Sequence, residues 1–182
     1  HIGIGVHRAA DGAWFMRAIG DSQAEKEFGV LSSLCVAYTK EPLWIWINVA
    51  AGRGLRAFDL NGKSDPYCIV RCNRQVFKTD TAKKTLTPQW NNSFRISFWS
   101  EAEMLKKDIL LEVFDWDALS KDDLMGVTAV MCHDIVKAHE YDAWLKLEAD
   151  ARIKAELVAG EIHIIAKRLE PPAPAAAATT TN

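Results

Sequence analysis

Residues 59–67 read DLNGKSDPY, a polar loop with a carboxylate near each end that leads into a strand beginning at Pro66. Asn61 and Gly62 allow this loop to fold back sharply, because both residue types tolerate the backbone conformations of tight turns. Proline is accepted at the first residue of a strand, where its missing N–H is not needed. The stretch therefore predicts an acidic loop, carrying Asp59 and Asp65, at the end of a β-sheet.

A second acidic loop follows the apolar strand 109–113, where residues 114–126 read FDWDALSKDDLMG. Side chains alternate along a strand, so Asp115 and Asp117 are expected on the same side, and the following loop can return Asp123 to them. Any one of these aspartates could simply stabilise a turn or a helix cap. Five together, however, would repel one another without a cation.

Clustered carboxylates on loops suit calcium best among the common metal ions. Ca²⁺ takes about six to eight oxygen ligands in flexible geometry, whereas Mg²⁺ requires a stricter octahedron. Zinc would favour His or Cys. The sequence therefore predicts Ca²⁺ as the cofactor bound by the carboxylates of these two loops.

Around these loops the chain alternates short apolar strands with turn signals, which is typical of an antiparallel sandwich. The fold class expected is all-β, with two four-stranded sheets. The eight predicted strands are 43–49, 66–72, 76–81, 94–98, 109–114, 126–131, 143–147 and 161–166. A short helix is expected at 134–139, while 149–157 is either helical or loop. Cys68 and Cys72 are read as core residues on one strand face.

Three regions are expected along the chain: an extension at 1–40, the main domain at 41–170 and a disordered linker at 171–182. The extension begins with a hairpin pattern, and Ser22 with Glu25 resembles a capping box that opens a helix. The linker contains only Pro, Ala, Thr and a terminal Asn, which cannot form a core.

The composition of the chain excludes several classes of function. A formal net charge of −2 argues against a nucleic-acid binder. The four cysteines are too irregular for a disulfide framework or a zinc site, so we read them as reduced thiols in the cytosol. No stretch reaches the roughly 20 apolar residues of a membrane span.

Three motifs, in order, resemble the C2 domains of protein kinase C and synaptotagmin: residues 59–67, the Thr-Leu-Thr-Pro-Gln-Trp-Asn run at 85–91, and residues 115–126. The resemblance covers roughly residues 43–169 and implies that Asp59, Asp65, Asp115, Asp117 and Asp123 bind calcium. Asp122 is left out, because its neighbour Asp123 better matches the spacing of the family. None of the five is substituted, which points to the calcium-responsive class. The late strand after residue 160 resembles the circularly permuted, type II arrangement, although residues 30–38 could instead supply an extra first strand.

The resemblance implies a module that binds anionic phospholipid, such as phosphatidylserine, and moves from the cytoplasm to the membrane periphery with calcium. Bound calcium would switch the loops from repelling to attracting anionic lipid. Trp116 and Leu119 are candidates for lipid contact, although a residue in this loop could also be buried. The lipid-binding candidates are Leu60, Lys63, Trp116, Leu119 and Lys121. Phosphoinositide specificity is not expected, because Asp80 interrupts the basic strand that reads such head groups in related domains.

Two other functions remain open. A protein-interaction module could keep the sandwich but recruit a polypeptide without calcium. The pair Asp115 and Asp117 also resembles the nucleophile motif of haloacid-dehalogenase-type phosphatases, but the α/β sheet and separate lysine and acidic motifs of those enzymes are missing. The chain is therefore not expected to be an enzyme.

Overall fold

The computed structural model describes residues 3–8, 14–19, 42–59, 62–118 and 120–170. The chain divides into two compact units, His1–Glu41 and Pro42–Asn182. In the described part of the chain, no helix is long and apolar enough to cross a bilayer. The predicted helix after Ser22, the alternative strand at 30–38 and the linker at 171–182 lie outside the described residues.

The first unit contains an antiparallel pair of strands. Strand β1 (Gly3–Arg8) pairs with β2 (Trp14–Ile19), with Gly3 opposite Ile19 and Arg8 opposite Trp14. The antiparallel pair agrees with the hairpin pattern predicted from the alternating apolar residues.

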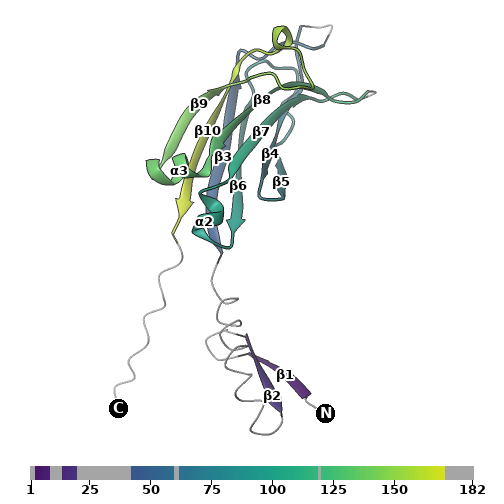
Figure 1. Ribbon diagram of the computed structural model, residues 1–182. Coiled ribbons are helices and arrows are strands. Elements are labelled where there is room, and N and C mark those ends of the chain that lie inside the picture. The colour runs from purple at the N-terminus through teal and green to yellow at the C-terminus, as the bar shows by residue number, and fades with distance from the viewer. Residues whose placement is uncertain (1–2, 9–13, 20–41, 60–61, 119, 171–182) are drawn as a thin grey trace, which may run out of the picture. The chain divides into compact units, whose positions relative to one another are not determined.

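The second unit is an antiparallel sandwich of two four-stranded sheets, in the orders β6-β3-β10-β9 and β5-β4-β7-β8 (Figure 1). The all-β, eight-stranded prediction is confirmed. The last strand lies beside the first strand of the sandwich, as expected of the permuted arrangement. The strands are β3 (Leu43–Arg53), β4 (Pro66–Cys72), β5 (Gln75–Lys78), β6 (Gln89–Phe98), β7 (Asp108–Asp115), β8 (Asp123–Met131), β9 (Tyr141–Lys146) and β10 (Glu161–Leu169).

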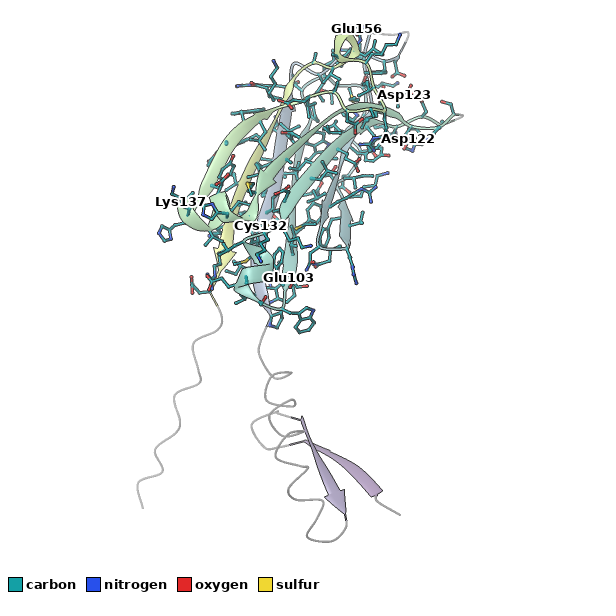
Figure 2. All side chains as sticks on the ribbon, viewed as in Figure 1. Glu103, Asp122, Asp123, Cys132, Lys137 and Glu156 are labelled. Atoms are coloured by element: carbon teal, nitrogen blue, oxygen red, sulfur yellow. The ribbon has the colours of Figure 1, made fainter. Side chains whose placement is uncertain are left out.

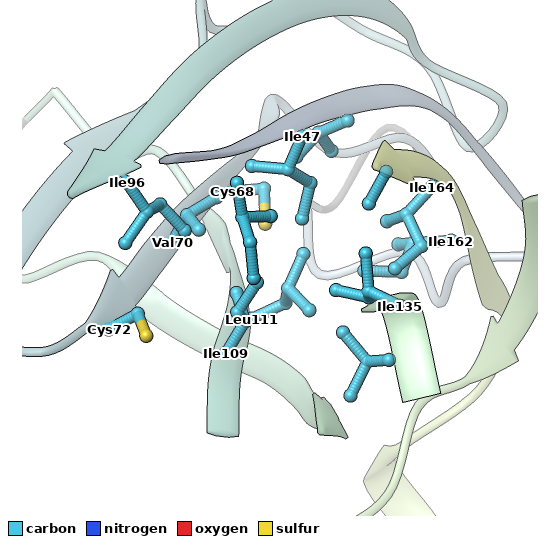
Figure 3. Close-up of a cluster of buried hydrophobic side chains, with 14 of the residues drawn as sticks. Ile47, Cys68, Val70, Cys72, Ile96, Ile109, Leu111, Ile135, Ile162 and Ile164 are labelled. Atoms are coloured by element: carbon cyan, nitrogen blue, oxygen red, sulfur yellow. The ribbon is translucent and has the colours of Figure 1, made fainter. Parts of the chain in front are cut away.

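The core lies between the sheets, where alternate residues of each strand point inward (Figure 3). Ile47 from β3, Leu111 from β7 and Ile164 from β10 are all fully buried. Cys68 and Cys72 are also buried, which confirms their reading as core residues. Burial of these side chains supplies the main driving force for bringing the two sheets together.

Several elements extend beyond the predicted bounds or were missed. Strand β6 begins at Gln89 rather than at 94, and β3 continues to Arg53 past a register shift between Val49 and Ala51. Within the described residues of the sandwich, three helical segments connect strands: α2 (Glu101–Met104), α3 (Cys132–Ala138) and the 3₁₀ turn η1 (Ala155–Leu157). Helix α3 lies near the predicted position, whereas α2 was not predicted.

Trp90 anchors the start of β6 within the sandwich. Its indole Nε1–H donates to the carbonyl of Pro66 at 3.0 Å, and only 6% of the residue is exposed. This contact ties the Thr-Leu-Thr-Pro-Gln-Trp run to the first residue of β4, next to the acidic loop. Trp90 therefore has a structural role, with its ring buried and its N–H satisfied.

Candidate functional site

Strand register brings the two acidic loops to one end of the second sheet. Pro66, the first residue of β4, pairs with Asp115, the last residue of β7. Asp115 in turn pairs with Asp123, the first residue of β8. Directly paired residues of antiparallel strands have their Cβ atoms about 5 Å apart. Asp65, Asp115 and Asp123 therefore lie at the ends of three adjacent strands, and Figure 2 shows Asp123 at the end of the sandwich opposite Glu103.

Asp115 is a buried carboxylate among other carboxylates. Only 2% of the residue is exposed, and its Oδ1 accepts a hydrogen bond from the backbone N–H of Asp65. Burial raises the pKa of Asp115, and the negative charges of Asp59 and Asp117 raise it further. A cation beside this group would favour its charged form and so oppose both effects.

Asp65 is held by two donors from the β5–β6 connection. The ammonium of Lys83 lies 3.0 Å from Asp65 Oδ2, and the backbone N–H of Lys84 donates to Oδ1 at 2.6 Å. Burial acts to raise the pKa of Asp65, but these two partners outweigh it and hold the pKa below its usual value. Lys83 was not among the predicted site residues.

The loop between Asp59 and Asp65 closes through its backbone. The N–H of Asp59 donates to the carbonyl of Lys63 at 3.1 Å, and the N–H of Gly62 donates to the carbonyl of Asp59 at 3.0 Å. Gly62 has a φ of 75°, which is accessible to glycine at little cost. The sharp turn predicted here is present, and it holds Asp59 close enough to affect Asp115.

Asp122, which the sequence analysis set aside, organises the second acidic loop. Its Oδ2 accepts from the hydroxyl of Tyr67 at 2.6 Å, and its Oδ1 accepts from the backbone N–H of Asp117 at 3.1 Å. The hydrogen bond from Tyr67 lowers the pKa of Asp122. The ammonium of Lys78 lies 3.5 Å from the centre of the Tyr67 ring. Nothing in the local sequence marks this role, because Tyr67 is remote along the chain.

The predicted lipid-binding residues are only partly within the described chain. Leu60 and Leu119 lie outside it, whereas Lys63 and Lys121 are exposed. Trp116 is 38% exposed, and the ammonium of Lys83 lies 3.3 Å from its ring centre. The alternative of a buried Trp116 is therefore wrong, because more than a third of the residue is exposed.

A second charged cluster lies behind the site, on the outer face of β7. Glu112 is 2% exposed, and its two oxygens are 2.6 Å from Arg71 and 2.6 Å from Arg152. Burial acts to raise the pKa of Glu112, but the two arginines lower it overall. Arg152 belongs to the connection that leads to η1, so this cluster fastens that connection to the sheet.

The donor set at the loop end fits a calcium ion in its chemistry, since carboxylate oxygens dominate and Asp115 is buried beside like charges. These carboxylates lie near one another, but they are not gathered around a common point. Among the residues described, no three His, Cys, Asp or Glu side chains form a group that could hold a metal ion. The carboxylate of Asp65 pairs with Lys83, so its side chain would have to rotate to join the other carboxylates around one ion. The neighbouring Asp122 is held by the hydroxyl of Tyr67.

Known proteins resemble this chain in sequence and in fold. Human Ras GTPase-activating protein 4B is 34% identical over 124 residues, which are 66% of this chain and 14% of that protein. Mouse extended synaptotagmin-1 is 32% identical over 112 residues, 62% of this chain and 9% of that protein. The chain thus spans only a small part of these relatives.

A solved structure of a pair of C2 domains from extended synaptotagmin 2, with calcium bound, superposes with a TM-score of 0.59 at 25% identity. That alignment covers 70% of this chain and 46% of the other. The model of the C2 domain family matches residues 45–147, from the first strand of the sandwich to the residue after β9. Because this match includes more than half of its residues, and the chain folds as a sandwich of two four-stranded sheets, the chain belongs to the C2 domain family.

Proposed function

We propose that the chain is a calcium-dependent module that binds anionic phospholipid and has no catalytic activity of its own. The observation that carries this proposal is the buried Asp115 carboxylate, whose pKa is raised by burial and by Asp59 and Asp117. A fold that keeps a carboxylate in this position gains stability from a bound cation. The calcium-bound structure of extended synaptotagmin 2 supports calcium as that cation.

Each acidic residue has a role in this proposal. Asp115 would supply an inner ligand from the end of β7, and Asp123 a neighbouring one from the start of β8. The remaining ligands would come from the two loops, namely Asp59, Asp65 and Asp117. Bound calcium would supply positive charge and open coordination positions for lipid oxygens.

The loops would then attract an anionic surface. Five carboxylates at one end of the sandwich repel phosphatidylserine, and divalent ions would neutralise most of that charge. Lys63 and Lys121 are exposed in the same loops and would add to the positive potential. Trp116, with part of its indole exposed, suits the interfacial region of a bilayer. In a cell, the module would move from the cytoplasm to the membrane periphery when calcium rises.

Sedimentation with lipid vesicles tests this function. We expect the chain to pellet with phosphatidylserine vesicles in Ca²⁺, and to remain in the supernatant in Mg²⁺ or with neutral phosphatidylcholine vesicles. Calcium should also raise the melting temperature by preferential binding to the folded state. Binding that is equal in Ca²⁺ and in chelator would overturn the calcium dependence. Absence of vesicle binding in every condition would favour a C2-type protein-interaction module.

A further inference from the structure

Lys83 contacts both acidic loops at once. Its ammonium pairs with Asp65 Oδ2 at 3.0 Å and lies 3.3 Å from the centre of the Trp116 ring. The backbone links the same partners, since the N–H of Trp116 donates to the carbonyl of Asp65 at 3.1 Å. A positive charge from the β5–β6 connection is thus placed between the loop that ends at Asp65 and the loop that begins at Trp116.

Both carboxylate oxygens of Asp65 have donors. Lys84 holds Oδ1 through its backbone N–H at 2.6 Å, while Lys83 holds Oδ2 through its side chain. The Lys83 side chain is 51% exposed, so its ammonium can leave the carboxylate for water without a rearrangement of the fold. The backbone N–H has no such freedom. Of the two contacts, the one through Lys83 is therefore the one that a competing cation can replace.

We propose that Lys83 is a tethered counter-cation of Asp65 that competes with calcium for this carboxylate and thereby sets the calcium affinity of the site. This inference rests on the proposed function, because it concerns the same carboxylates. Asp65 cannot give Oδ2 fully to Lys83 and to a metal ion at the same time. Whatever free energy the Lys83 contacts contribute to the protein alone is subtracted from the binding of calcium, since the two are thermodynamically linked.

The chain provides a matched control for this idea in the next residue. Lys83→Gln removes the charge and the contact with Asp65 Oδ2. Lys84→Gln removes an equal charge one residue away but keeps the backbone N–H that Asp65 uses. A general electrostatic effect on calcium would be similar for the two variants, whereas direct competition would appear only in the first. Lys83→Arg keeps the charge and serves as a conservative replacement.

The experiment is a calorimetric titration of each protein with Ca²⁺ in the absence of lipid, together with melting curves in chelator. We expect Lys83→Gln to bind calcium roughly fivefold to tenfold more tightly, as the loss of one exposed ion pair and one cation–π contact predicts. In chelator its melting temperature should fall. Lys84→Gln should gain less than about twofold, because an exposed charge without a direct contact is largely screened. Lys83→Arg should remain close to the unaltered chain.

The outcomes separate the two proposals. If the unaltered chain binds calcium and Lys83→Gln binds with the same affinity, competition by Lys83 is wrong while the calcium site stands. Equal gains in Lys83→Gln and Lys84→Gln would also overturn the competition, leaving only a general charge effect. If neither the unaltered chain nor Lys83→Gln binds calcium, the proposed function and this inference fail together. Binding by Lys83→Gln alone would support the competition in its strongest form.

Discussion

The hydroxyl of Tyr67 donates to Asp122 Oδ2 at 2.6 Å and so joins the start of β4 to an acidic loop 55 residues later in the chain. The other oxygen of Asp122 accepts from the backbone N–H of Asp117. Tyr67 is also stacked on Phe114, with 5.6 Å between the ring centres. One aromatic side chain thus positions the loop that carries Asp117.

Tyr67→Phe should therefore loosen this loop while leaving the sandwich folded. The variant keeps the aromatic stack and loses one hydrogen bond to a charged group, which is worth about 2 kcal/mol at most because Asp122 can turn to water. We expect a fall of a few degrees in melting temperature and weaker calcium binding. Differential scanning calorimetry with and without calcium measures both. Tyr141→Phe, which changes a tyrosine at the start of β9, is the control and should leave the calcium response intact.

Asp117→Asn should have opposite effects on stability and on calcium binding. In chelator, its melting temperature should stay level or rise slightly, because the Asp117 charge contributes to the raised pKa of Asp115. Calcium-dependent vesicle binding should weaken strongly, since an amide is a poorer ligand than a carboxylate.

Asp122→Asn is the natural comparison for that variant. It changes a carboxylate that positions the loop and is not a proposed ligand, so it should lower the melting temperature in both conditions and reduce the calcium-induced rise less than Asp117→Asn does. If Asp117→Asn bound phosphatidylserine vesicles with an unchanged calcium dependence, the ligand role of Asp117 would be refuted.

Glu112→Gln should destabilise the chain in a pH-dependent manner. The pKa of Glu112 lies below its ordinary value of 4.5, so the folded state binds fewer protons at this group than the unfolded state does. The stability that it contributes is present above that ordinary value and is lost as the pH falls through the lowered pKa. We expect a loss of about 1 to 2 kcal/mol at neutral pH, since both arginines are about half exposed.

Urea unfolding of Glu112→Gln and of the unaltered chain across an acidic pH series checks this sign. The difference between the two proteins should shrink as the pH falls below the ordinary range for glutamate. A difference that is constant with pH would show that the charge of Glu112 is not what holds Arg71 and Arg152 in place.

Phosphoinositide should add little to vesicle binding. Asp80 exchanges two hydrogen bonds with Asn92, so an acidic group is fixed beside the basic strand. Arg71 and Lys78 have partners within the chain, namely Glu112 and the Tyr67 ring. Adding a phosphoinositide to phosphatidylserine vesicles should therefore improve binding less than about fivefold, the effect of roughly one basic contact. A tenfold or larger gain in sedimentation would show that these residues release their partners for the lipid.

Much of the architecture could be predicted because its signals are local. Alternation of apolar residues placed all eight strands, and the strand over 66–72 has the predicted bounds. Turn chemistry at Asn61 and Gly62 marked the sharp loop, which the backbone hydrogen bonds of Asp59 close. The boundaries of β3 and β6 were less predictable. The two strands continue to pair beyond Val49, up to Ala51 opposite Gln89, only because the register shifts there, and this shift is defined by the pairing itself.

The partners of the charged side chains were decided by tertiary structure alone. Glu112 stands in an apolar strand, and its partner Arg71 is 41 residues away. Lys83 reaches Asp65 across 18 residues, and Tyr67 reaches Asp122 across 55. The sequence by itself determined which carboxylates lie at the strand ends, because strand periodicity and loop position are properties of neighbouring residues. Which of them are already held by a cation or a hydroxyl depends on how strands distant in sequence pair, and that pairing exists only in the folded chain.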